Sequence, residues 1–459
     1  MSFRKALLAA AVFPLLLAST LPVSAESLKG AMAKAYANNP DLNSARAALR
    51  ATDENVPIAK AGYRPQVAAT ASGTVTNLRD FSVAGVDDET YRSGQVGVSI
   101  TQTIFDGFQT LSRVRSAESG VYSAQENLKA NEMQILLSAV QAYADIAQYQ
   151  QVVSIRKQNL EFLNEQLNAA KTRLDVGEGT RTDVSQAQAQ LAAGKALLAS
   201  AVAQLKIARA TYVQIVGSEP KDVKQVGPAT SGLPRKLDQA VQIAITEHPS
   251  VRASLHAVDS AGYNVDEAEG ALLPGVTVRG STARTGSDQD GSSGYDYTAS
   301  SITAQITVPI YQGGAEFGRI RQAKENLGAQ QIRVDSVRAQ IQQMVVAAYA
   351  QLEAAQAAIS ANQQQLTAAK LALEGMIEER NVGQATTLDV LNAQQTVLNA
   401  KESLAQSARD AVVSSYSGLA AMGRLTVADQ NLQVAEYRAN DHYEAVKDKW
   451  FGLRTVDGK

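Results

Sequence analysis

Two stretches of the chain carry an apolar residue at every seventh position, before and after a short glycine-containing segment. In the first half these residues are Ile146, Val153, Leu160, Leu167 and Leu174, then Val184, Leu191, Leu198, Leu205 and Tyr212. In the second half they are Leu352, Ile359, Leu366 and Leu373, then Val390, Val397 and Leu404. Sustained seven-residue spacing is typical of coiled-coil packing. The pattern predicts two antiparallel helical hairpins, each with an exposed tip.

The two tips share the sequence Val-Gly-x-x-Thr-x-x-Asp-Val, at residues 176–184 and 382–390. Glycine favours the tight turn that such a tip requires. Asp183 and Asp389 stand where an aspartate caps the N-terminus of a returning helix. Turn formation and capping could explain these residues completely, and that interpretation stays open beside the functional one given below.

Apolar and polar residues alternate in four segments, and two of these segments precede each helical hairpin. The apolar positions are Val67, Ala69, Ala71 and Val75; Val96, Val98 and Ile100; Val276 and Val278; and Ile302, Ala304, Ile306 and Val308. We expect polar loops at 78–91 and 285–294 to join the members of each pair. Strands with one apolar face are typical of transmembrane β-barrels. A half-buried strand pair of a soluble domain has the same pattern, so alternation alone leaves both possibilities open.

Further helices are expected around the strands. One covers residues 28–38, and a second, over about 41–62, is interrupted or bent at Pro57, because proline has no backbone N–H. The long helix 109–175 would measure on the order of 100 Å at about 1.5 Å per residue. The second, antiparallel helix of this hairpin is expected to end at about residue 216.

The order of these elements occurs twice. Asn39-Pro40-Asp41 in the first copy corresponds to His248-Pro249-Ser250 in the second, and Tyr143 corresponds to Tyr349. Such repetition indicates a tandem duplication. We divide the chain into a first repeat, a connector, a second repeat and a tail, at residues 26–217, 218–236, 237–430 and 431–459. The tail either wraps the helical midsection or is disordered, and the sequence does not decide between them.

Residues 1–25 have the composition of a secretory signal peptide, with a basic start, an apolar core and the small residues Val23-Ser24-Ala25 at its end. No later segment is expected to be long and apolar enough for a transmembrane helix, so a membrane-embedded form would need a β-barrel. The chain has no cysteine, which excludes disulfides, thiolate metal sites and a cysteine-linked lipid anchor.

Charge and histidine usage narrow the function further. A net charge of −2 over 459 residues gives no reason to expect a nucleic-acid partner. The three histidines, His248, His256 and His442, have no nucleophile or metal-ligand spacing around them. We therefore expect no enzymatic activity, no cofactor and no metal site.

Four strands per chain are too few to close a barrel. Membrane barrels have at least about eight strands, and the long helices likewise carry apolar residues on more than one side. Association of several chains would satisfy both requirements. A secreted protein on the order of 100 Å long, with a barrel at one end, indicates a conduit that leads from the outer membrane into the periplasm.

The duplicated plan, the tip motif and the Gln- and Ala-rich return helices resemble the TolC family of outer-membrane channels, which serve drug efflux and type I secretion. The resemblance covers residues 27–430 and implies an α+β fold. A homotrimer with four barrel strands per chain would continue into a periplasmic α-helical coiled-coil barrel. It also implies contact with outer-membrane lipid, a periplasmic adaptor protein as partner and, through the adaptor, an inner-membrane RND or ABC transporter.

Other functions stay open beside this resemblance. The sequence does not separate small molecules from proteins as cargo. A soluble periplasmic coiled-coil adaptor or structural protein, with its strands in a β-domain outside the bilayer, is the alternative. A secreted hydrolase is a more distant one.

The resemblance also assigns roles to the tips. Asp389 corresponds to an acidic lumen position that would form a ring of three carboxylates, and Asn392 takes a second position that is acidic in the family. Such a ring attracts cations. Docking to the adaptor is expected at Val176, Gly177, Thr180, Val382, Gly383 and Thr386.

In the closed state of the family, a Tyr and an Arg of the second tip bond to a Thr-Asp pair of the first tip. That pair is present here as Thr182 and Asp183, whereas Arg380 takes the Tyr position and Ala385 the Arg position. We expect an ion pair between Arg380 and Asp183 to hold the tip closed. A solvated cation at a helix end is the other interpretation of Arg380.

Overall fold

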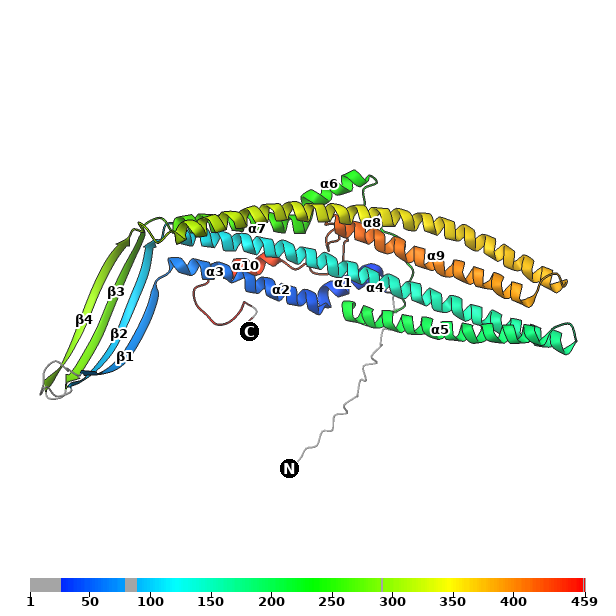
Figure 1. Cartoon of the computed structure of the whole chain (residues 1–459), viewed down its shortest axis with the longest axis horizontal. Helices are drawn as coiled ribbons and strands as arrows, with labels where there is room; N and C mark the ends of the chain where they lie inside the picture. The colour runs from blue at the N-terminus through cyan, green and yellow to red at the C-terminus, as the bar shows by residue number, and fades with distance from the viewer. Residues whose placement is uncertain (1–25, 79–88, 290–291, 457, 459) are drawn as a thin grey trace, which may run out of the picture.

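The computed structural model describes residues 26–78, 89–289, 292–456 and 458. The expected signal peptide and the loop residues 79–88 and 290–291 lie outside the described residues. A β-sheet forms one end of the elongated chain, and the two hairpin tips form the other (Figure 1).

The elements follow one another in two similar series. The first is α1 (Leu28–Asn38), α2 (Pro40–Asp53), α3 (Asn55–Lys60), β1 (Gln66–Leu78), β2 (Glu89–Phe105), α4 (Gln109–Asp175) and α5 (Arg181–Val216). The second is α6 (Leu237–Glu247), α7 (Pro249–Gly270), β3 (Gly275–Gln289), β4 (Ser292–Thr307), α8 (Ala315–Asn381) and α9 (Thr387–Ala421), followed by α10 (Ala439–Val446) in the tail. A short 3-10 turn, Ala61–Tyr63, links α3 to β1. The predicted α+β fold with four strands and an internal repeat is confirmed.

The break before β1 lies earlier than expected. We placed it at Pro57, whereas α2 ends at Asp53 and α3 begins at Asn55. In a continuous helix the N–H of residue 57 would bond to the Asp53 carbonyl, and proline has none. The Pro57 ring is accommodated within the first turn of α3. The interruption therefore appears upstream of Pro57, the residue that causes it.

All four strands form one antiparallel sheet in the order β1-β2-β3-β4. The register places the predicted apolar positions on one face: Val67 lies opposite Ile100, Ile100 opposite Gly280, and Gly280 opposite Ile302. The other face carries mainly Ser, Thr and Gln. Both faces are exposed in the single chain, and the outer edges of β1 and β4 are unpaired within the described residues.

The sheet extends further than the polarity pattern indicated. Residues 285–294 were expected to be a loop, but β3 continues to Gln289 and β4 begins at Ser292. Likewise Leu78 pairs with Glu89, within the expected loop 78–91. Polar side chains do not prevent backbone pairing, so strand ends outside an apolar environment leave no period-two signal.

Strand order and helix order agree across the molecule. Because α3 leads into β1, β2 into α4, α7 into β3 and β4 into α8, the helices lie side by side in the order α3, α4, α7, α8. Towards the tips α5 takes the place of α2, and α9 takes the place of α7 (Figure 1). The wall therefore consists of four columns: two with an unbroken 67-residue helix, α4 or α8, and two with a joint between shorter helices.

The joint of the first repeat is made by Asn39. Its Oδ1 accepts a hydrogen bond from the Leu42 N–H at the start of α2 (3.0 Å), and its Nδ2 donates to the Ile215 carbonyl at the end of α5 (2.9 Å). One buried amide thus caps two helices that meet end to end.

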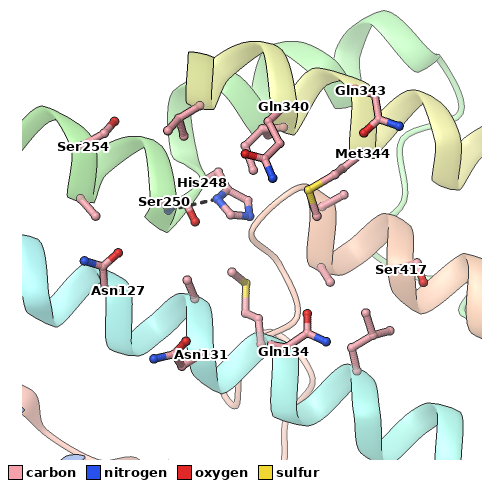
Figure 2. Close-up of a pocket in the computed structure, with 18 of the residues that line it drawn as sticks. Asn127, Asn131, Gln134, His248, Ser250, Ser254, Gln340, Gln343, Met344 and Ser417 are labelled. Carbon is pink, nitrogen blue, oxygen red and sulfur yellow. Dashed lines mark hydrogen bonds between the residues drawn. The ribbon is translucent and has the colours of Figure 1, made fainter. Parts of the chain in front are cut away.

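His248 makes the corresponding joint between α9 and α7. Its Nδ1 accepts a hydrogen bond from the Ser250 N–H at 3.1 Å, the dashed line in Figure 2, and its ring also interacts with the backbone of Ala420. Only 5 % of His248 is exposed. Gly423, with a positive φ of 78°, follows α9, and a Cβ there would lie 3.1 Å from the His248 Cα. A larger residue would separate the two helices.

The main core lies at the level of these joints. It joins α1 and the middle of α4 to the ends of α5 and α9, with Tyr36, Tyr143 and Tyr212 among its largest fully buried side chains. The duplicated tyrosines hold the segments that cross this region: Tyr143 donates to the Glu26 carbonyl (2.8 Å), and Tyr349 donates to the Pro234 carbonyl (2.8 Å).

Between the joints and the tips, the two helices of each hairpin are held together by apolar residues of the predicted seven-residue repeat and their neighbours. Leu163, Leu167 and Leu191 are buried between α4 and α5, and Leu366 and Val397 are buried between α8 and α9. One expectation needs correction, because α5 is long and apolar enough by composition to cross a membrane, with a mean hydropathy of 1.3 over 18 residues. In the structure α5 packs against α4.

The tail packs against the first repeat. Tyr443 of α10 is buried with Val56 and Val121, and His442 Nδ1 lies 2.8 Å from Oδ2 of the buried Asp53. Of the two expectations for the tail, attachment along the helical wall is therefore the one observed.

We expect His248 to make stability depend on pH. Burial lowers its pKa to about 4, whereas in an unfolded chain the pKa is about 6.5. The folded state thus favours the neutral ring, so its contribution is complete above about pH 6.5 and is lost as the pH falls towards 4. At about pH 5 the loss should be about 2 kcal/mol per chain.

A comparison of thermal midpoints at about pH 7.5 and about pH 5 checks this expectation. His248→Asn, which copies Asn39, should keep the joint and lose less stability on acidification. Asn39→His should add a second pH-dependent joint. Equal losses in all three proteins would contradict the assignment.

Candidate functional site

The shared tip sequence forms the same geometry twice. After α4, the Gly177 N–H bonds to the Leu174 carbonyl (3.1 Å) and the Glu178 N–H to the Arg173 carbonyl (2.8 Å). Gly177 has a φ of 80°, and Gly383 at the second tip has a φ of 78°. Each glycine therefore ends its helix in the left-handed conformation, which a Cβ disfavours.

The Thr-x-x-Asp part of each tip is a capping box. Asp389 Oδ2 accepts bonds from the Thr386 N–H (2.9 Å) and hydroxyl (2.6 Å), and the Thr386 hydroxyl accepts from the Asp389 N–H (3.2 Å). Thr180 and Asp183 make the same bonds at the first tip. The bonds from the threonines lower the pKa of both aspartates, so both are ionised at neutral pH.

Three contacts connect the two tips within one chain. The side chain of Thr387 at the second tip contributes to lowering the pKa of Asp183, and Arg173 Nη2 lies 3.4 Å from Asn381 Oδ1. Arg380 at the end of α8 donates to the Gln166 side chain on α4. The tips are therefore held together by polar groups.

The expected ion pair between Arg380 and Asp183 is wrong for the single chain. Arg380 bonds to Gln166 and to Asn381 Oδ1 (3.2 Å), whereas the Asp183 carboxylate accepts the capping bonds from Thr180. The physical reason is local, because the capping box directs the carboxylate towards the backbone of its own tip.

Arg380 is a cation with neutral partners. Burial, and secondarily the positive charge of Arg173, lowers its pKa, and its Nε has no hydrogen-bond partner among the described residues. A guanidinium stays charged even so. The Arg380 contact is consequently weaker than an ion pair at this place would be.

Polar contacts cross the seam between the hairpins at several levels, although Leu391 of α9 is also buried in the apolar cluster of α4 and α5. Bonds join α4 to α9 at Asp145–Arg409 (2.7 Å), Arg156–Glu402 (2.8 Å) and Asn159–Gln394 (2.8 Å). The sequence analysis missed this seam. A signal was present, because Asp145, Asn159 and Gln166 are multiples of seven residues apart, in the position directly before the apolar series.

The other expected site residues lie at or next to the tips, and they are exposed to solvent in the single chain. Val176 and Val382 are 65 % and 71 % exposed, and Thr182 and Asn392 are exposed as well. Gly177, Thr180, Gly383 and Thr386 are exposed beside them. Their expected roles in docking and in the lumen stay predictions.

A second candidate place is a cavity of about 770 Å³ between α4, α7, α8 and α9. Figure 2 shows that amide and hydroxyl side chains surround it, among them Asn127, Asn131, Gln134 and Gln340. Arg333 is the one charged residue in its lining. No group of three or more metal-ligating side chains occurs in the described part of the chain.

Comparison with known proteins agrees with this geometry. The sequence model of the family described as "Outer membrane efflux protein" matches residues 31–218 and 240–424. The outer membrane efflux protein BepC of Brucella suis is 46 % identical over 95 % of this chain and 93 % of its own length. The outer membrane protein TolC of Escherichia coli is 24 % identical over 88 % of this chain and 84 % of its own.

Solved structures share the fold at low identity. The CmeC outer membrane channel of Campylobacter jejuni has a TM-score of 0.76 at 16 % identity, covering 93 % of this chain and 90 % of that one. The open state of the MtrE outer membrane channel of Neisseria gonorrhoeae has a TM-score of 0.71 at 20 % identity, covering 87 % and 90 %.

The relatives are channels of efflux and secretion systems in the outer membrane, and the match extends over both repeats. The soluble adaptor considered as an alternative does not fit these matches. The chain belongs to the outer membrane efflux protein family, and it is a TolC-type channel that extends from the outer membrane into the periplasm.

Proposed function

We propose that three copies of this chain form one exit duct for efflux or type I secretion. This proposal is supported mainly by the arrangement of strands and helices. Each of the four columns joins a strand to a helix, and the outer edges of β1 and β4 are unpaired within the described residues. Pairing β1 of one copy with β4 of the next closes the sheet, and the helices, which have the same order, close with it.

Three copies fit the polarity of the sheet. Two copies would give about eight strands, whose interior is narrow enough to be filled by side chains. The inward face here is rich in Ser, Thr and Gln, which suits a water-filled lumen, and about twelve strands provide one. The apolar face, with Val67, Ile100 and Ile302, then faces lipid.

The exposed tips are the part of the duct that can receive a partner in the periplasm. We assign docking of an adaptor to Val176, Gly177 and Thr180 of the first tip, and to the matching Val382, Gly383 and Thr386 of the second. The exposed valines give each tip an apolar contact. An inner-membrane transporter would supply the energy through the adaptor, since the duct itself performs no chemistry on its cargo.

The proposal is tested by native mass spectrometry and planar-bilayer conductance of the detergent-extracted protein. We expect a mass of three protomers and discrete channels. A dimer, or a protein that forms no channels, would overturn the three-copy duct.

Asp389 should set cation selectivity. Asp389→Asn removes a charge that three copies would place around the lumen, so the reversal potential in a salt gradient should shift towards zero. Asp183→Asn is the matched control, because it removes an equivalent capping box. Equal shifts for both variants would show that capping, and not a lumen ring, is the role of Asp389.

Arg380 should help to keep the tips closed. Arg380→Ala and Gln166→Leu each remove the same contact between hairpins, so each should raise single-channel conductance. The double variant should show no further rise, because both changes act on one interaction. Combination with Asp183→Asn should be additive. An unchanged conductance in both single variants would rule out this contact as part of the closure.

A further inference from the structure

The end of the tail carries large apolar side chains that the chain does not cover. Trp450, Phe451 and Leu453 are 57 %, 86 % and 104 % exposed. They lie within residues 447–456, which we call the terminal segment. Exposed apolar groups that adjoin one another mark a surface for a partner or a membrane.

The terminal segment is nevertheless held at a defined place. Upstream, α10 is attached to the first repeat through His442 and Tyr443. Lys60 Nζ of α3 then binds Asp448 Oδ1 at 2.7 Å, and Arg64 Nη1 donates to the Lys449 carbonyl at 3.0 Å. These contacts direct the chain along α3 towards the sheet.

Trp450 lies beside the start of β1, a position that we call the foot of β1. The guanidinium carbon of Arg64 is 4.7 Å from the centroid of its ring, a cation–π distance. Arg64 precedes Gln66, the first residue of β1, by two positions. The level of Trp450 is therefore the level at which the first strand begins its course into the bilayer.

In the proposed duct, the face that carries the tail is the outer face of the wall. Arg46 lies against the rings of both Tyr36 of α1 and Tyr437 of the tail, at 4.5 and 5.1 Å, and Tyr36 Oη accepts a bond from the Tyr437 N–H. The tail and α1 thus share one face. If that face pointed inwards, several copies of α1 and the tail would fill the bore.

The composition of the terminal segment is that of a membrane interface. Trp and Phe stand beside the cations Lys449 and Arg454. Aromatic rings with a polar edge prefer the headgroup level of a bilayer, and neighbouring Lys and Arg bind anionic phospholipids. In the proposed duct, the apolar face of β1 and β2 faces the lipid beyond this level.

We propose that the terminal segment is a membrane-interface anchor, with Trp450, Phe451 and Leu453 inserted into the periplasmic leaflet of the outer membrane at the foot of β1. Lys449 and Arg454 lie at the phosphates of that leaflet. The inference rests on the proposed duct, in which β1–β4 span the bilayer. The anchor fixes the height of the first column relative to the lipid.

The chain contains one tryptophan and 15 tyrosines, so emission excited at the red edge of tryptophan absorption, where tyrosine does not absorb, reports on Trp450 alone. The full-length protein is reconstituted into vesicles of phosphatidylethanolamine and phosphatidylglycerol, and in parallel into the same lipids brominated high on the acyl chains. We expect brominated lipid to quench most of the emission, and acrylamide in the water to quench it little. Conductance of the same vesicles shows separately whether the strands have inserted.

Phe451→Ser with Leu453→Ser should weaken quenching by brominated lipid and leave conductance unchanged. A wild-type emission that brominated lipid does not quench would overturn the anchor. Acrylamide then identifies the real environment: strong quenching would place Trp450 in water, and weak quenching would place it against a neighbouring chain. Undiminished lipid quenching in the double variant would contradict a lipid contact for Phe451 and Leu453.

Discussion

Within the residues that the structure describes, the backbone along the outer edges of β1 and β4 is unpaired, and this is the constraint on which the rest of the structure depends. In lipid, every N–H and C=O without a partner costs several kcal/mol, and these edges are 13 and 16 residues long. A single chain therefore cannot place its sheet in a bilayer alone. Duplication supplies four strands, and the covalent link from each strand to a helix transmits the order of the sheet to the whole wall.

Two kinds of contact between helices occur in the region between the joints and the tips. Within a hairpin the seam is apolar, so the two helices exclude water and stay together. Between hairpins, amides and ion pairs such as Arg156–Glu402 make most of the contacts, beside one apolar contact through Leu391. Polar groups can exchange protein partners for water at small net cost. The hairpins are consequently durable units, whereas the contact between them is separable.

The sequence predicted the parts of the fold that repeat at a fixed period. Heptad positions such as Leu167 and Val397 are buried in the hairpins, and Val67, Ile100 and Ile302 share one face. At the tips, the glycines and the Thr-x-x-Asp caps have the local geometry that their residue types favour. These features depend on near neighbours or on simple periodicity, which a single sequence displays.

Features set by long-range contacts were less predictable. Charge complementarity suggested Arg380 with Asp183, but the competing local cap and the position of Gln166 decide the partners. The strand ends near Gln289 were missed because backbone pairing continues there without an apolar face. The attachment of the tail depends on Asp53 and Val56, nearly 400 residues away from it along the chain.

The two jointed columns give the wall a mechanical property that its dimensions do not reveal. Among the described helices of the wall, α4 and α8 pass the level of Asn39 and His248 without interruption, whereas the other two columns have no continuous backbone there and are joined by side-chain caps within the main core. A continuous helix resists twisting through its ladder of backbone bonds, and a side-chain joint lacks that ladder. In the jointed columns, side-chain caps and the packing of the main core therefore carry load across this cross-section in place of a backbone ladder.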